Sequence, residues 1–82
     1  MRIRILFFGM LKDVVGQSQE ELEMPEGSSA ADVLAHYESR FPRLGVSMSS
    51  LALAVNQEYA DPDSKLKAGD EVALLPPVSG GA

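Results

Sequence analysis

The sequence predicts a small α+β domain in which one main helix packs against one face of a mixed β-sheet. Strand-like runs, rich in β-branched, aromatic or alternating apolar residues, occur both before and after a single long helical pattern. The chain has 82 residues, which is enough for one domain and too few for two. Hydrophobic residues make up 45% of the sequence, so we expect it to fold.

The first expected element is a strand over residues 3–8, where Ile, Leu and Phe dominate and Gly9 follows. Residues 10–15 then predict a short helix that ends at Gly16, because glycine is common just past a helix end. Residues 20–24 alternate between acidic and apolar side chains, which indicates a second, half-buried strand.

The main helix is expected to begin after Ser29, an N-cap residue, with Asp32 three positions later as the acid of a capping box. Pro42 is expected to end this helix, and residues 45–50 have no pattern beyond that of a loop. The apolar residues at helical spacing form one stripe: Val33, Leu34, Tyr37 and Phe41.

The second half of the chain predicts a strand at 51–55, a turn at 56–57 and a short extended piece near Tyr59. A turn at 67–70 leads into the last strand, 71–75. The order strand, strand, helix, strand, strand fits a β-grasp arrangement at this length.

Pro76 and Pro77 should end the last strand, because proline cannot donate a hydrogen bond to a β-ladder. We therefore expect a folded domain over residues 1–77, followed by a flexible tail, Val-Ser-Gly-Gly-Ala, over residues 78–82.

Side-chain parity predicts an exposed apolar patch on the sheet. In the first strand Arg2 and Arg4 mark the solvent side, and Leu6 and Phe8 share that side. The same alternation in the last strand puts Leu75 on the face away from the helix. A lone helix covers only one face of a sheet, so Leu6, Phe8 and Leu75 are candidates for a partner site.

Composition excludes several classes of function. The net charge is −5, and no basic stripe of the kind that binds nucleic acid is present. There are no cysteines, which removes disulfides, thiolate metal sites and cysteine nucleophiles. No run reaches transmembrane length, and the N-terminal residues lack the pattern of a signal peptide, so a cytoplasmic protein is expected.

Side chains for catalysis are also scarce. His36 is the only histidine and lies inside the expected helix, where we expect it to be packed or solvated. Asp70 and Glu71 are adjacent, so a strand would point them to opposite faces, and Asp61 and Asp63 flank a proline in an expected turn. No metal site is predicted, and the four methionines are interpreted as core filler.

The C-terminal tail is the remaining place for chemistry. Gly80 and Gly81 have no side chains and can enter a narrow channel, while Pro76 and Pro77 stiffen the exit from the fold. A carboxylate activated as an acyl-adenylate can exchange oxygen for sulfur without any cysteine on the carrier. Composition alone leaves open the alternative that the tail is only a frayed end.

Two segments give the sequence a family resemblance. The opening Ile5-Leu6-Phe7-Phe8-Gly9 is similar to the start of the molybdopterin synthase small subunit, the MoaD family. The segment from Ala54-Val55-Asn56-Gln57 through Gly69-Asp70-Glu71-Val72 to Pro76-Pro77-Val78-Ser79-Gly80-Gly81 resembles the end of that family. The resemblance covers nearly the whole chain and implies a ubiquitin-like β-grasp fold.

It also implies a sulfur carrier without an active site of its own. A thiocarboxylate on Gly81 would donate sulfur to a cyclic pyranopterin phosphate to form the dithiolene of molybdopterin. No cofactor would be bound permanently; ATP would give only a transient acyl-adenylate. The tail residues inserted into the partner would be Pro76, Pro77, Val78, Ser79 and Gly80.

The implied partners are an adenylating enzyme related to ubiquitin E1 and a MoaE-like large subunit, assembled with the carrier as a heterotetramer. The family's contact positions fall on Phe8, Tyr59 and Leu75, of which Phe8 and Leu75 also follow from strand parity. Ala82 departs from the family, which ends at the second glycine, so we expect the 82-residue form to be a precursor or an altered variant.

Three alternatives remain from the sequence. One is a related carrier for thiamine synthesis or tRNA thiolation, although thiamine carriers usually lack the Pro-Pro pair. Another is a protein modifier joined to lysines through Gly81. The third is a ubiquitin-like interaction domain whose tail is inert.

Overall fold

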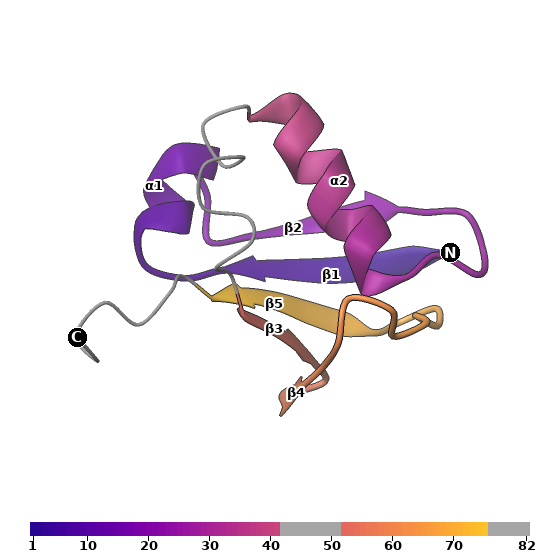
Figure 1. Cartoon of the computed structure of the whole chain (residues 1–82). Coiled ribbons are helices and arrows are strands. Elements are labelled where there is room, and N and C mark those ends of the chain that lie inside the picture. Colours follow the sequence, from indigo (N-terminus) through magenta and orange to yellow (C-terminus); the bar gives the residue numbers. More distant parts are fainter. Residues whose placement is uncertain (42–51, 76–82) are drawn as a thin grey trace.

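A computed structural model describes residues 1–41 and 52–75, which form a mixed sheet crossed on one face by a helix (Figure 1). The elements are β1 (Arg2–Phe7), α1 (Met10–Val15), β2 (Gln19–Glu23), α2 (Ala30–Arg40), β3 (Ala52–Val55), β4 (Glu58–Tyr59) and β5 (Glu71–Leu75). The strand order is β2-β1-β5-β3-β4. β1 and β5 run parallel, and every other neighbouring pair is antiparallel.

This architecture confirms the α+β class and the β-grasp order predicted from the sequence. Strand ends differ by about one residue from the predicted ones, which is ordinary for boundaries set by hydrogen bonds. The expected loop at 45–50, the helix stop at Pro42 and the tail at 78–82 lie outside the described residues. None of the helices in the described ranges is long and apolar enough to cross a membrane.

The core lies between the sheet and α2. Along β1 and β5, the paired residues Ile5–Val72 and Phe7–Leu74 all point toward the helix. Burying a large apolar side chain contributes about 1.5–3 kcal/mol relative to leaving it exposed, so this layer dominates the stability. The buried apolar cluster comprises Ile3, Ile5, Phe7, Leu11, Ala30, Val33, Tyr37, Leu53, Leu66, Val72 and Leu74.

The start of α2 is held as the sequence predicted. The backbone N–H of Ser29 donates to the Asp32 carboxylate at 2.8 Å, which is the reciprocal half of a capping box. The next two backbone N–H groups donate to carbonyls of Ser64 and Pro62, at 3.0 and 2.8 Å. The turn around Asp61–Asp63 therefore has a structural task, since it satisfies donors at the helix N-terminus.

A polar clamp joins α2 to the outer strand β2. The Tyr37 hydroxyl donates to Glu20 Oε1 at 2.6 Å, and Arg40 Nη1 lies 3.1 Å from the same oxygen. The hydrogen bond from Tyr37 is the main cause that holds the pKa of Glu20 below its ordinary value. Burial, reinforced by Glu20, raises the pKa of the Tyr37 phenol well above its usual range, so the phenol stays a donor.

The lowered pKa of Glu20 predicts a pH dependence of folding. A carboxyl group with a depressed folded-state pKa contributes stability above its ordinary value, near 4.5, and this stability is lost as pH falls through the folded-state value. Urea unfolding between about pH 7 and pH 3 should therefore show a shallower loss for Glu20→Gln than for the parent protein.

Tyr37→Phe tests the same clamp without removing the carboxylate. It should lower the free energy of unfolding at neutral pH by about 1–2 kcal/mol, because a hydrogen bond to a charged acceptor is lost. Glu38→Gln, an exposed change on the same helix, serves as the control. Parallel pH profiles for the parent and Glu20→Gln would contradict this account.

Candidate functional site

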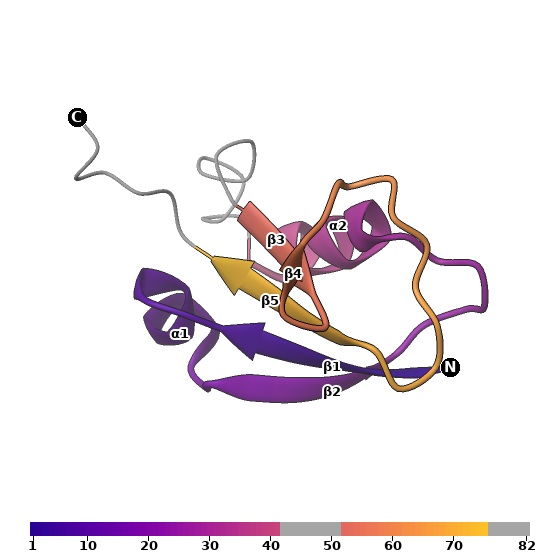
Figure 2. The same ribbon diagram turned by 90° about the horizontal axis from the view of Figure 1, so that it is seen from below.

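The face of the sheet opposite α2 is the candidate site, and no described helix covers it (Figure 2). Pairing places Leu6 beside Ala73 across β1 and β5, Ala73 beside Ala54, and Ala54 beside Tyr59. Leu75, two residues after Ala73 in β5, pairs with Ala52 of β3. Three side chains that the sequence analysis singled out, Leu6, Tyr59 and Leu75, thus share one face.

Exposure follows the predicted parity. Phe8 is 44% exposed and Tyr59 is 83% exposed, whereas Phe7 is 2% and Leu74 is 0% exposed. Leu6 and Leu75 are half-buried. The backbone N–H of Phe8 donates to the carbonyl of Leu74 at 3.3 Å, so Phe8 lies beside the end of β5. Leu6, Phe8, Tyr59 and Leu75 are called the apolar half of the open face below; their role as partner contacts remains a prediction.

Within residues 1–41 and 52–75, one exposed apolar side chain was missed by the sequence analysis. Met10 is 53% exposed, so the interpretation of all four methionines as core filler is wrong for this residue. Met10 opens α1 directly after Gly9, whose φ of 58° redirects the chain at the end of β1. The only sequence signal was its place beside Leu11, which takes the buried position of that short helix.

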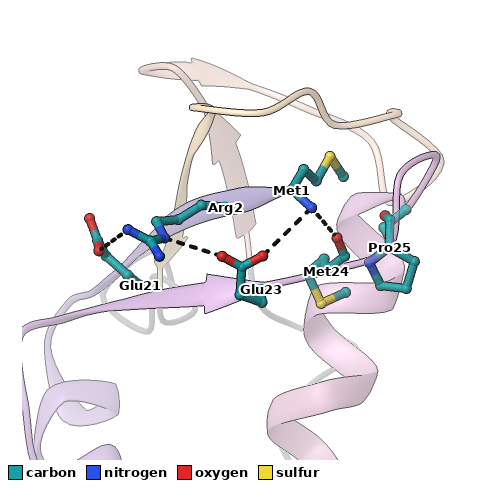
Figure 3. Close-up of polar contacts among 7 residues, drawn as sticks. Met1, Arg2, Glu21, Glu23, Met24 and Pro25 are labelled. Atoms are coloured by element: carbon teal, nitrogen blue, oxygen red, sulfur yellow. Dashed lines mark hydrogen bonds and ion pairs between the residues drawn. The ribbon is translucent and has the colours of Figure 1, made fainter.

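The other end of the open face carries charges (Figure 3). Arg2 Nε lies 3.2 Å from Glu23, and Arg2 Nη1 lies 3.7 Å from Glu21. The amino group of Met1 donates to the carbonyl of Met24 at 2.7 Å and lies 3.7 Å from Glu23. Exposed pairs of this kind contribute at most about 1 kcal/mol each, so they shape the surface more than they stabilise the fold.

The β3–β4 hairpin sets the position of Tyr59. Asn56 and Gln57 have φ values of 53° and 71°, the left-handed pair expected of a two-residue type I′ turn. Asn56 Nδ2 donates to Asp70 Oδ1, and Asn56 Oδ1 accepts from the backbone N–H of Glu71, both at 3.0 Å. The Asp70 carboxylate therefore braces a turn.

The remaining candidate catalytic and metal-binding side chains do not come together in one site within the described residues. His36 is half-buried and its ring meets Tyr37 edge-on at 4.9 Å. Its Nε2 has no hydrogen-bond partner within residues 1–41 and 52–75. In the described ranges, no three His, Asp or Glu side chains lie together as metal ligands would. The predicted tail residues lie outside the described residues: Pro76, Pro77, Val78, Ser79, Gly80 and Gly81.

Comparison with known proteins identifies the family. The ThiS family matches residues 5–81. The chain belongs to the ThiS family. The match extends through Gly81, so it covers the tail as well as the sheet and the helix.

Curated relatives of this ThiS-family chain share its whole length. It is 40% identical to the molybdopterin synthase sulfur carrier subunit of Chlamydomonas reinhardtii, over 99% of this chain and 100% of the relative. The protein of the same name from Dictyostelium discoideum is 34% identical, over 98% and 96% of the two chains.

Solved structures agree with the fold. A putative molybdopterin converting factor subunit 1 from Pyrococcus furiosus superposes with a TM-score of 0.85 at 27% identity, over 95% of this chain and 99% of that one. SAMP1 from Haloferax volcanii gives 0.84 at 26% identity, over 99% and 100%. A complex of subunits 1 and 2 of the molybdopterin-converting factor from Helicobacter pylori gives 0.69 at 27% identity, over 99% and 100%.

The exposure pattern predicts that the same substitution has opposite effects on folding at two neighbouring phenylalanines. Phe8→Asp should change the free energy of unfolding by less than about 1 kcal/mol, because its side chain already contacts water. Phe7→Asp should prevent folding, because it would bury an unpaired carboxylate in the core. Urea titrations followed by circular dichroism provide the measurement, and an unfolded Phe8→Asp variant would refute the assignment of faces.

Proposed function

We propose that this chain is the sulfur carrier subunit of a molybdopterin synthase. The observation that carries the proposal is an exposed apolar patch at the end of β5, in a chain that matches carriers of that name from end to end. A patch beside the start of the tail lets a partner hold the domain and receive the tail together. In this proposal the partner provides the active site, and the carrier contributes its patch and its tail.

The chemistry requires only the carboxyl group of Gly81. An adenylating enzyme related to ubiquitin E1 joins this carboxylate to the α-phosphate of ATP, and pyrophosphate leaves. A hydrosulfide ion then attacks the acyl carbon, AMP leaves as the bond to its phosphate breaks, and a thiocarboxylate remains after loss of the proton. In the large subunit the thiocarboxylate sulfur bonds to a carbon of the cyclic pyranopterin phosphate. Water then cleaves the acyl–sulfur bond, so the sulfur stays on the pterin and the carrier leaves with its carboxylate.

The large subunit is proposed to cover the apolar half of the open face and to receive residues 76–81. The Helicobacter pylori relative is similar to this chain over its whole length and was solved with subunit 2 of its factor. Because each dithiolene needs two sulfur atoms, we propose a heterotetramer with two carriers. Because activation depends on ATP, we also propose that the carrier functions in the cytoplasm.

Binding to the large subunit should depend on the apolar half. Leu75→Asp and Phe8→Asp should each weaken binding by about 2–4 kcal/mol, because a charge would be buried without a partner. Ala35→Asp is the matched control, since it adds the same charge to an exposed position on α2. Isothermal titration calorimetry measures all three, and equal affinities for Ala35→Asp and Leu75→Asp would reject the proposed contact.

A protein modifier is the second candidate, because SAMP1, whose name stands for small archaeal modifier protein 1, has a closely similar fold. The two functions differ in where the activated Gly81 goes. A modifier would appear as chain-sized mass additions on lysines of other proteins, whereas a carrier would be recovered free, with one oxygen of its terminal carboxylate replaced by sulfur.

The residue after Gly81 gives a sharp test of the carrier chemistry. In this sequence Ala82 holds the carboxyl carbon of Gly81 in an amide and moves the terminal carboxylate outward by about 3.3–3.6 Å. A misplacement of about 1 Å can cost a hundredfold in rate, so a chain that ends at Gly81 should form thiocarboxylate and the Ala82 form should not.

Both forms should be incubated with the adenylating enzyme, ATP and a sulfur donor, and then weighed intact by mass spectrometry. The Gly81 form is expected to gain the mass difference between sulfur and oxygen. Equal conversion of the Ala82 form, with Ala82 still attached, would contradict the assignment of Gly81 as the reacting residue.

A further inference from the structure

Two charges on the open face are left without a partner in the described ranges. Arg2 contacts Glu21 and Glu23, and Asp70 accepts hydrogen bonds from Asn56 and from the backbone N–H of Lys67. Arg4 lies in register with Glu21 in β2 and with Glu71 in β5, yet neither Arg4 nor Glu71 has a side-chain ion pair or hydrogen bond among those residues.

Arg4 and Glu71 also border a hollow. Its wall on the β3 side is formed by Asn56 and Gln57, whose turn is fixed by the hydrogen bonds to Asp70 and Glu71. Arg2 and Glu21 close the side toward β2. A protruding polar side chain of a partner could enter this hollow without moving the backbone.

The size of the sheet brings this hollow within reach of the proposed partner. Strands lie about 4.8 Å apart and rise about 3.3 Å per residue, so the open face measures roughly 20 Å in each direction. A stable interface buries about 800 Å² on each partner, more than the apolar half offers. Arg4 precedes Leu6 by two residues on the same face, about 6.6 Å along β1.

We propose that Arg4 and Glu71 orient the large subunit on the carrier. The partner places a carboxylate against Arg4 and a cationic side chain against Glu71, in addition to covering the apolar half. This order of charges determines in which direction β5 runs across the surface of the large subunit. It therefore also determines the direction in which the tail enters the partner. The inference rests on the proposed function, because it names a specificity device for the same interface.

Charge reversals test the order of charges. Arg4→Glu and Glu71→Lys should each weaken binding to the large subunit at least tenfold at about 50 mM salt, and the loss should shrink to under threefold at about 500 mM. Arg4→Met keeps the aliphatic stem and should weaken binding threefold or more. Lys65→Glu, on the loop that contacts the start of α2, should stay within twofold of the parent.

The double variant, Arg4→Glu with Glu71→Lys, separates orientation of a partner from a pair that serves only the fold. It keeps the net charge and leaves opposite charges at the two register positions, but inverts their order. If the partner recognises the order, binding should stay at least tenfold weaker than for the parent. Recovery of the parent affinity would overturn the proposal, as would single reversals that bind as tightly as Lys65→Glu.

Phe8→Asp, measured beside these variants, distinguishes a failure of the orienting role from a failure of the proposed docking. If Phe8→Asp weakens binding and the charge variants do not, only the orienting role of Arg4 and Glu71 fails. If the parent itself does not bind the large subunit, or Phe8→Asp binds as tightly as the parent, the proposed docking fails and the orienting role fails with it.

Discussion

One helix can cover only one face of a five-stranded sheet, and this constraint organises the whole molecule. α2 takes the face that carries Ile3, Ile5 and Phe7, and these side chains become the core. Because side chains alternate along a strand, the same choice turns Leu6 to the other face. Among the residues that the structure describes, no second helical layer covers that face, so its apolar residues are available to a partner.

In the proposed function the carrier supplies a surface and a reacting end while other enzymes supply the catalysis, and this arrangement follows from the same constraint. The fold is held by the layer between α2 and the sheet and by the Glu20–Tyr37–Arg40 clamp, so the open face can change without loss of the core. A carrier that works through its surface and its end needs no pocket of its own. The reacting carboxyl group can then be handled by one enzyme during activation and by another during transfer.

Local patterns predicted much of the structure and could not predict the rest. The capping box at Ser29 and the facing of Phe7 and Phe8 depend on residues within a few positions, and both are confirmed. The clamp joins Glu20 to Tyr37 across 17 positions, and the brace joins Asn56 to Asp70 across 14. Such contacts depend on which strands become neighbours in the sheet. The alternation of side chains along a strand does not determine that strand order. Met10 was missed because alternation along strands says nothing about the first residue of a short helix.

The polarity of the open face is a consequence of the parallel pairing of β1 and β5. Both strands begin with charged side chains, Arg2 and Arg4 in β1 and Glu71 in β5, and both end with apolar ones. Parallel pairing therefore gathers Leu6, Phe8 and Leu75 at one end of the sheet and the charges at the other. An antiparallel arrangement would have placed Leu75 against Arg2 and divided the patch. Since residue 76 follows directly from β5, the chain leaves the sheet from the apolar end, where a partner that covers the patch would meet it.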